Sequence, residues 1–178
     1  GRGARICSRD LDDVGSFHSS YSVADRTRTF LKVQDGCDYN CSFCTIPLAR
    51  GHSRSDTVTG VLANLAELAG AGVKEVVLTG INLGDFGKGA DGGRTRDSSF
   101  YELVQAVDAD APAGIERFRI SSIEPNLLTD EIIEFVAASK RFMPHFHIPL
   151  QSGSNRILGL MRRRYKRELY AERVALIK

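Results

Sequence analysis

The residues with the clearest chemical potential are three cysteines within eight positions. Cys37, Cys41 and Cys44 follow the spacing C-x3-C-x2-C, directly after the apolar stretch 29–34. Three thiolates on one tight loop can hold three irons of a [4Fe–4S] cube and leave the fourth iron open to a cofactor or substrate. The alternative is a zinc site in which His52 completes a Cys3His set. Structural zinc sites usually use two distant cysteine pairs, and the chain has no second pair, so the spacing favours the cluster.

The fourth cysteine, Cys7, stands apart and is expected to be a free thiol. Densely packed thiols in a chain without a secretory leader are typical of a metal site rather than of disulfides. The first fifteen residues are polar and charged, and no apolar run reaches the roughly 18 residues that span a bilayer. We therefore expect no membrane segment and a cytoplasmic location.

The composition is that of an ordinary globular protein. Of the 178 residues, 42% are hydrophobic and 26% are charged, which excludes a disordered chain, a collagen or a coiled coil and fits roughly one domain. The net charge of +2 is too small for a protein that coats nucleic acid, so any such contact must be local. The densest group of cations has five in the six residues 162–167 and fits either an anion-binding patch or the solvated start of a helix.

The elements that must position these residues alternate between strand and helix. Strands are expected at 29–34, 75–81, 117–123 and 145–150. Helices are expected after a cap at Ser55 or Asp56, after Ser98 or Ser99, after Thr129, and around Tyr170, Val174 and Ile177. This order predicts an α/β fold with parallel strands and right-handed crossovers, either an open doubly wound sheet or part of a barrel with about four βα units. A complete eight-fold barrel needs about 250 residues.

In both architectures functional groups gather at the carboxyl ends of the strands. That rule selects the segments 36–54, 80–87, 121–126 and 150–156. Within the first of them, Arg50 and Arg54 flank a glycine and fit either an anion site or a solvated loop. Residues 1–28 have weak periodicity and are interpreted as a linker or the tail of a neighbouring domain, and 29–178 as one core.

The cysteine motif after the first strand of such a series resembles the radical S-adenosyl-L-methionine (SAM) superfamily. The longer string Val33-Gln-Asp-Gly-Cys-Asp-Tyr-Asn-Cys-Ser-Phe-Cys-Thr-Ile-Pro-Leu-Ala-Arg-Gly51 closely resembles the methylthiotransferases. Three further stretches, 78–84, 119–125 and 147–154, agree in order, so the resemblance covers about residues 26–178. The Thr-Ile-Pro-Leu-Ala-Arg-Gly and Ser-Ser-Ile-Glu-Pro strings are most similar to enzymes acting on N6-threonylcarbamoyladenosine in tRNA. The branches for isopentenyladenosine in tRNA and for a ribosomal-protein aspartate usually differ there.

The resemblance implies an enzyme with two cofactors, a [4Fe–4S] cluster and SAM. Cys37, Cys41 and Cys44 would hold the cluster, and SAM would chelate its open iron. Reductive cleavage of SAM would give methionine and a 5′-deoxyadenosyl radical, which removes hydrogen from the adenine ring before a methylthio group replaces it. The protein would supply binding, orientation and exclusion of water.

The resemblance also implies which residues contact SAM. Phe43 would border its adenine through the backbone. Gly80 and Asn82 would belong to the loop that receives the amino group of SAM. Glu124 and Gln151 follow the third and fourth strands and would reach the ribose or the methionine part.

The family design further implies a tRNA partner held at its anticodon loop, an electron donor, an amino-terminal domain with a second cluster and a carboxyl-terminal RNA-binding barrel. The sequence has only Cys7 upstream of the motif and ends at Lys178, so it is interpreted as a core fragment that is inactive in methylthiolation by itself. The alternative of another class is a zinc-stabilised RNA-binding module. The cations expected to contact tRNA phosphates are Arg162, Arg163, Arg164, Lys166 and Arg167.

Overall fold

The computed structural model describes residues 15–22, 28–89 and 95–178, so Cys7 and most of the segment 1–28 lie outside the described residues. A four-stranded sheet has the order β1-β2-β5-β6. Its strands are β1 (Ser20–Tyr21), β2 (Thr29–Lys32), β5 (Glu75–Thr79) and β6 (Arg117–Ile120). The last three are parallel, and β1 pairs antiparallel with β2.

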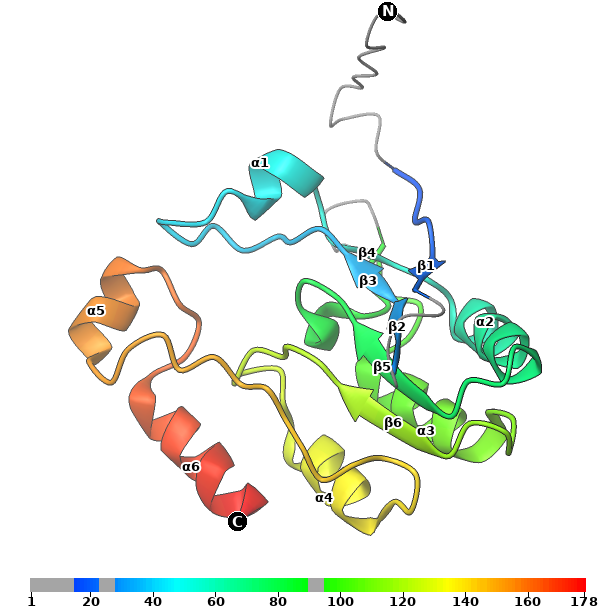
Figure 1. Cartoon of the computed structure of the whole chain (residues 1–178). Coiled ribbons are helices and arrows are strands. Elements are labelled where there is room, and N and C mark those ends of the chain that lie inside the picture. The colour runs from blue at the N-terminus through cyan, green and yellow to red at the C-terminus, as the bar shows by residue number, and fades with distance from the viewer. Residues whose placement is uncertain (1–14, 23–27, 90–94) are drawn as a thin grey trace, which may run out of the picture.

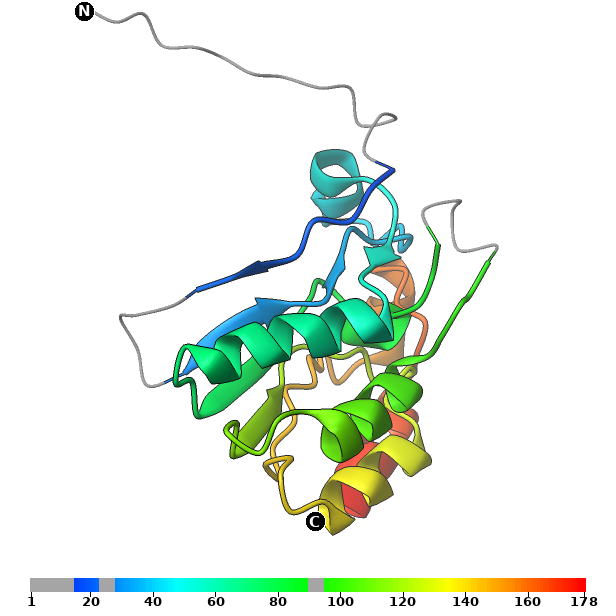
Figure 2. The same ribbon diagram turned by 90° about the vertical axis from the view of Figure 1, so that its right-hand side faces the viewer.

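Three helices, which follow the strands β2, β5 and β6 along the chain, cover one face of the sheet (Figures 1 and 2). They are α2 (Val58–Gly70), α3 (Phe100–Asp110) and α4 (Asp130–Ala138). The predicted α/β class with parallel strands is therefore confirmed, in the form of a partial barrel.

In the ranges that the structure describes, no helix combines the length and apolarity needed to cross a bilayer.

The stretch predicted as the fourth strand, 145–150, requires a correction, because it forms no regular strand. It runs beside the segment that follows β6, and one isolated parallel bridge, between Ser122 and His147, joins the two. Pro144 has no N–H to donate to a ladder. The N–H of His145 donates instead to the carbonyl of Met143, at 2.7 Å. The ladder is thus interrupted where a regular strand would begin.

Other predicted boundaries also shift. The strands β5 and β6 end at Thr79 and Ile120, two and three residues earlier than expected. The helix α6 (Arg167–Ile177) matches the predicted fourth helical stretch. Two helices of five and six residues, α1 (Ile46–Arg50) and α5 (Asn155–Leu160), were not predicted, because they are too short to show an apolar period.

The helix caps agree in part with the sequence. Ser99 begins α3 through a complete capping box with Glu102. The cap of α2 is Thr57, whose hydroxyl accepts from the N–H of Gly60 at 3.0 Å, rather than Ser55 or Asp56. Ser55 is unavailable because it belongs to β4 (Arg54–Ser55).

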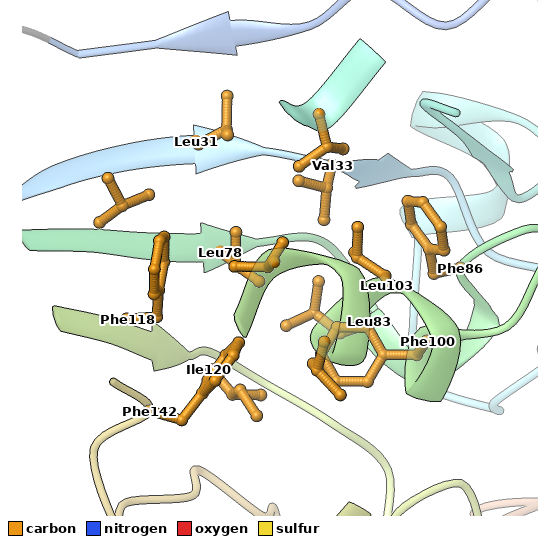
Figure 3. Packing of buried hydrophobic residues seen from close by; sticks show 14 of the residues in the cluster. Leu31, Val33, Leu78, Leu83, Phe86, Phe100, Leu103, Phe118, Ile120 and Phe142 are labelled. Atoms are coloured by element: carbon orange, nitrogen blue, oxygen red, sulfur yellow. The ribbon is translucent and has the colours of Figure 1, made fainter. Parts of the chain in front are cut away.

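The core lies between the sheet and the helices α2, α3 and α4 (Figure 3). The middle strand, β5, buries its side chains on both faces, as expected for the centre of a parallel sheet. In β6, Phe118 and Ile120 are buried while Arg117 and Arg119, which alternate with them, are half-buried. Full burial of a Leu or Phe side chain contributes about 1.5–3 kcal/mol. The core thus fixes the strands whose carboxyl ends carry the site.

Candidate functional site

The cysteine loop begins at a closed base. The strand β3 (Gln34–Asp35) pairs antiparallel with β4, which brings the two ends of the loop together. The N–H of Cys37 donates to the carbonyl of Gly51 at 3.1 Å. Gly36 has φ +70°, and a Cβ there would lie 1.9 Å from the carbonyl oxygen of His52, so only glycine fits. The base is therefore built by close backbone contacts.

Beyond that base the three cysteines turn into one pocket of about 310 Å³. The N–H of Cys44 donates to the carbonyl of Cys41 at 3.1 Å, and the N–H of Tyr39 lies 3.4 Å from the sulfur of Cys37. Residues from five chain segments line this cysteine pocket: Cys37, Tyr39, Cys41, Phe43, Cys44, Ile46, Ile81, Asn82, Ser122, Ile123, Glu124, His147, Pro149, Gln151 and Arg163.

The three thiols form no disulfide and are partly or fully buried. Cys37, Cys41 and Cys44 are free cysteines. Burial raises the pKa of the Cys37 thiol to about 11, against the lowering effect of the Tyr39 N–H, so a bound metal must displace its proton. Among the described residues, no three His, Cys, Asp or Glu side chains are arranged to hold a single metal ion. A cubane cluster is larger than an ion and needs only the three thiolates, so the donor set fits a cluster.

The ligand of the zinc alternative, His52, does not face the cysteines. Its Nδ1 lies 2.9 Å from Oδ1 of Asp38. The neighbouring arginines are also engaged: Arg50 and Arg54 lie 3.1 and 3.5 Å from the carboxylate of Asp35. That engagement favours a structural role over the anion site considered for these two arginines.

Gln34 joins the cysteine loop to the loop after β5. Its side chain is fully buried. The amide nitrogen donates to the carbonyl of Gly36 at 2.8 Å, and Oε1 accepts from the N–H groups of Ile81 and Asn82 at 2.9 and 3.0 Å. One side chain therefore sets the distance between the two loops on opposite sides of the pocket.

Gly80 lies outside the cysteine pocket, in contrast to the other predicted SAM contacts. A Cβ at this position would lie 2.9 Å from Oε1 of Gln34 and 3.0 Å from a methyl group of Leu83. Its small size allows the Gln34 side chain to reach the two amides that follow. The structure thus supports a packing role for Gly80.

Asn82 and Glu124 line the pocket and are hydrogen bonded to each other. The backbone N–H of Glu124 donates to Oδ1 of Asn82 at 3.2 Å, and Nδ2 of Asn82 donates to Asp85 at 3.0 Å. Oε2 of Glu124 is buried without a hydrogen-bond partner among the described residues. Burial raises the pKa of Glu124, although Arg163 acts to lower it. An unpaired acceptor in a pocket fits the ammonium or hydroxyl groups of SAM.

Phe43 and Gln151 border the opening of the same pocket. The side chain of Phe43 is 56% exposed, and its ring lies 5.9 Å from the guanidinium of Arg163. Gln151 has φ 63°, a left-handed conformation that is uncommon outside glycine. Its backbone therefore turns sharply just after the segment beside β6.

The sequence did not identify Arg163 as a pocket residue. It was grouped with the cations expected to contact tRNA, but its side chain is only 6% exposed and donates to Cys41 and Glu124. Arg164 is also engaged, with its guanidinium 4.0 Å from the ring centroid of Tyr39. Charge density alone cannot distinguish an inward from an outward arginine. The exposed cations of the patch are Arg162, Arg164, Lys166 and Arg167.

Two further pocket residues form a polar pair. Oγ of Ser122 lies 2.7 Å from Nδ1 of His147. Asn126 donates to the hydroxyl of Tyr39 at 3.1 Å and thereby fixes the pocket wall beside Cys37. The sequence pointed to Ser122 and Asn126 through their position, because both lie in 121–126, one of the segments selected at the ends of the predicted strands.

Comparison with known families identifies the class of protein. The family model described as "Radical SAM superfamily" matches residues 31–178. The match covers most of the sequence, and the chain belongs to the radical SAM superfamily. The predicted cofactors, a [4Fe–4S] cluster and SAM, are those of this superfamily, and the predicted enzyme class is confirmed.

The curated relatives are tRNA methylthiotransferases. The chain is 44% identical over 157 residues to the threonylcarbamoyladenosine tRNA methylthiotransferase MtaB of Bacillus subtilis, covering 88% of this chain and 34% of that protein. It is 38% identical over 151 residues to the tRNA-2-methylthio-N(6)-dimethylallyladenosine synthase of Pelotomaculum thermopropionicum, covering 85% and 32%. The predicted resemblance to radical SAM methylthiotransferases of the MtaB type is confirmed. The chain spans about a third of the length of these relatives.

A solved structure agrees with the fold. The radical SAM methyltransferase TsrM from Kitasatospora setae, solved with cobalamin and a [4Fe–4S] cluster, superposes with a TM-score of 0.61 at 15% identity. The superposition covers 83% of this chain and 26% of TsrM. At this identity the likeness supports the partial radical SAM barrel and nothing finer.

Proposed function

We propose that this chain is the radical SAM core of a tRNA methylthiotransferase that acts on N6-threonylcarbamoyladenosine next to the anticodon. Cys37, Cys41 and Cys44 hold a [4Fe–4S] cluster, and SAM binds beside it. The observation that carries the proposal is the convergence of these thiols with the unpaired Oε2 of Glu124 in one pocket. Residues 29–178 form the core in this proposal, and a cytoplasmic location stays a prediction.

When bound, the cluster supplies the electron that cleaves SAM reductively. The protein residues bind and orient. Glu124 accepts a hydrogen bond from SAM through Oε2, while Asn82 holds the backbone of Glu124 in position. Ile81 and Ile123 line the pocket and exclude water from the reacting centre. Phe43, at the opening, borders the adenine of SAM, and Gln151 is positioned to contact its other end.

The choice of substrate rests on similarity. Identity to the threonylcarbamoyladenosine enzyme of Bacillus subtilis is 44%, against 38% for the dimethylallyladenosine synthase of Pelotomaculum thermopropionicum. The tRNA is proposed to contact the exposed cations of the 162–167 segment through its phosphates. The second cluster domain and the RNA-binding domain are proposed as parts of the whole protein.

Anaerobic reconstitution of the chain with iron and sulfide tests the core of this proposal. We expect a brown protein that contains the iron of one [4Fe–4S] cluster per chain, bleaches in air, and releases 5′-deoxyadenosine from SAM when dithionite is added. A colourless protein with one zinc per chain would contradict the proposal and favour a zinc-stabilised RNA-binding module. Analysis of tRNA from cells lacking the whole protein, for loss of the methylthio group on threonylcarbamoyladenosine, tests the substrate separately.

A further inference from the structure

Arg163 connects a proposed cluster ligand to a proposed SAM contact. One terminal nitrogen donates to Sγ of Cys41 at 3.2 Å, and the other donates to Oε1 of Glu124 at 3.0 Å. The side chain is 6% exposed, so water screens neither interaction strongly. No other cation of the 162–167 segment reaches a cysteine in the part of the chain that the structure describes.

The backbone directs this side chain inward. The N–H of Arg162 donates to the carbonyl of Gly159 at 3.0 Å, and the N–H of Arg163 donates to the carbonyl of Leu158 at 2.9 Å. This pair of hydrogen bonds is the Schellman pattern at the end of α5. Arg162 has φ 57°, so the chain reverses there although the residue is not glycine. Ser42 then ties the cysteine loop to this turn, because its hydroxyl donates to the carbonyl of Leu160 at 3.0 Å.

Aromatic rings hold the guanidinium in place. The ring centroids of Phe43 and Tyr165 lie 5.9 and 5.8 Å from its central carbon. The hydroxyl oxygen of Tyr165 lies 2.8 Å from the carbonyl oxygens of both Pro149 and Leu150, which share its single proton. The orientation of Arg163 is therefore fixed by groups outside its two hydrogen bonds, and the contact with Cys41 is preorganised.

A guanidinium stays protonated at all relevant pH values, so it brings a permanent positive charge to the sulfur. Hydrogen bonds to the sulfur ligands and nearby charge tune the reduction potential of an iron–sulfur cluster. Reduction adds a negative charge to the cluster. A cation beside one ligand stabilises the reduced form more than the oxidised form, and the carboxylate of Glu124, bound to the other terminal nitrogen, opposes this effect.

We propose that Arg163 is a positioning residue that raises the reduction potential of the cluster held by Cys37, Cys41 and Cys44 and keeps Glu124 oriented toward SAM. This inference rests on the proposed function. It assigns to Arg163 a role in the electron transfer that precedes SAM cleavage, in place of a contact with tRNA phosphate.

Redox titration of the reconstituted chain, followed by electron paramagnetic resonance, tests the inference. Arg163→Met removes the charge and both donors, and Arg163→Lys keeps the charge. Arg162→Met is the matched control, because it removes the adjacent charge at an exposed position. For Arg163→Met we expect at least a tenfold loss of the reduced form at a fixed potential. This loss corresponds to a reduction potential about 59 mV more negative for a one-electron couple. Arg163→Lys should lie between Arg163→Met and the unaltered chain.

The outcomes separate the inference from the proposed function. Absence of a cluster from the unaltered chain, read from its iron content, contradicts the proposed function itself. A potential that Arg163→Met leaves unchanged, or that Arg162→Met shifts equally, overturns the role of Arg163. Arg163→Met itself can fail to bind a cluster. In that case, a cluster bound by Arg163→Lys supports the inference. If both Arg163 variants lack a cluster while Arg162→Met binds one, the inference is overturned. Affinity for SAM, measured on oxidised protein, should fall for Arg163→Met and stay unchanged for Arg162→Met.

Discussion

The side-chain Oε1 of Gln34 lies 3.0 Å from the backbone nitrogen of Asn82, and this contact ties the cysteine loop to the loop that follows β5. The same oxygen accepts from the N–H of Ile81. On the other side, the amide nitrogen donates to the carbonyl of Gly36 and to the hydroxyl of Ser53. A single buried amide thus spans the carboxyl ends of two strands. The geometry of the pocket depends on it as much as on the cysteines themselves.

Replacing Gln34 by Leu should lower the free energy of unfolding by about 3 kcal/mol. The change leaves the N–H groups of Ile81 and Asn82 without their acceptor, and each buried group left unpaired costs about 1–3 kcal/mol. Urea unfolding of the apo chain measures the loss. The same substitution at exposed Gln105 is the control and should change stability by less than about 0.5 kcal/mol. Equal effects of the two variants would show that the hydrogen-bond network contributes little.

The three cysteines should act as a unit. A cube attached at three points has no spare protein ligand, so Ala at Cys37, Cys41 or Cys44 should each remove most of the bound iron. Cys7→Ala should retain it. Iron content and visible absorbance after anaerobic reconstitution provide the measurement. Full iron content together with SAM cleavage in Cys41→Ala would refute the ligand assignment.

Glu75 predicts a pH dependence of stability. Burial by itself would raise its pKa, but hydrogen bonds from Arg119 at 2.7 Å and Arg117 at 3.0 Å outweigh this and hold the pKa below its ordinary value. A carboxylate with a lowered folded pKa stabilises the protein above its unfolded pKa, about 4.3, and loses that contribution as pH falls through the folded value.

Glu75→Gln should therefore destabilise the chain by about 1–2 kcal/mol at pH 7, the scale of hydrogen bonds to a charged group. The difference from the unaltered chain should shrink as the pH falls below about 4. Denaturant unfolding across this pH range tests the sign. Glu116→Gln, which breaks exposed pairs with Lys74 and Arg117, should cost less than about 0.5 kcal/mol. A gap for Glu75→Gln that widens in acid would contradict the assignment.

The left-handed backbone at Arg162 predicts that substitution by glycine does not destabilise the protein, although glycine usually lowers stability. A left-handed conformation costs a non-glycine residue about 1–2 kcal/mol, and the extra entropy of glycine in the unfolded chain offsets about 0.4–1 kcal/mol of that. Arg162→Gly should thus be neutral or stabilising by up to about 1.6 kcal/mol. Arg156→Gly, inside α5, should instead destabilise by about 1 kcal/mol. Thermal unfolding compares the two, and a loss of stability at Arg162 would contradict the strain argument.

Sequence patterns predicted the parts of this molecule that depend on local rules. The helix that follows a cap at Ser98 or Ser99 is an example, and the position of the cysteines indicated functional groups at the end of the first core strand. The missed features depend on tertiary contacts. The apolar residues of 145–150 indicated a strand, but this stretch meets the segment after β6 at one isolated bridge, from His147 to Ser122. Arg163 faces inward because of a turn at Arg162 that is stabilised from the cysteine loop by Ser42, and no pattern within 162–167 reveals that contact.

The last prediction concerns contact with tRNA and the activity of the chain as it stands. Methylthiolation in the resembling family involves a second cluster and an RNA-binding barrel, and this chain spans about a third of its curated relatives. We expect no methylthio-nucleoside in the digest when the reconstituted chain is offered substrate tRNA, SAM and a reductant under argon. Its appearance there would show that the core alone suffices.

Binding of tRNA should nevertheless be measurable, weak and strongly dependent on salt, because its contacts are to phosphates. Lys166 is exposed at the start of α6, and Lys166→Gln should lower the slope of log affinity against log salt concentration by about 0.7–0.9. Lys140→Gln is the matched control, since Lys140 is exposed beside the amino-terminal end of β6, away from the pocket. Fluorescence anisotropy with labelled tRNA at several salt concentrations gives both slopes. Equal slopes for the two variants would exclude the 162–167 segment as the contact surface.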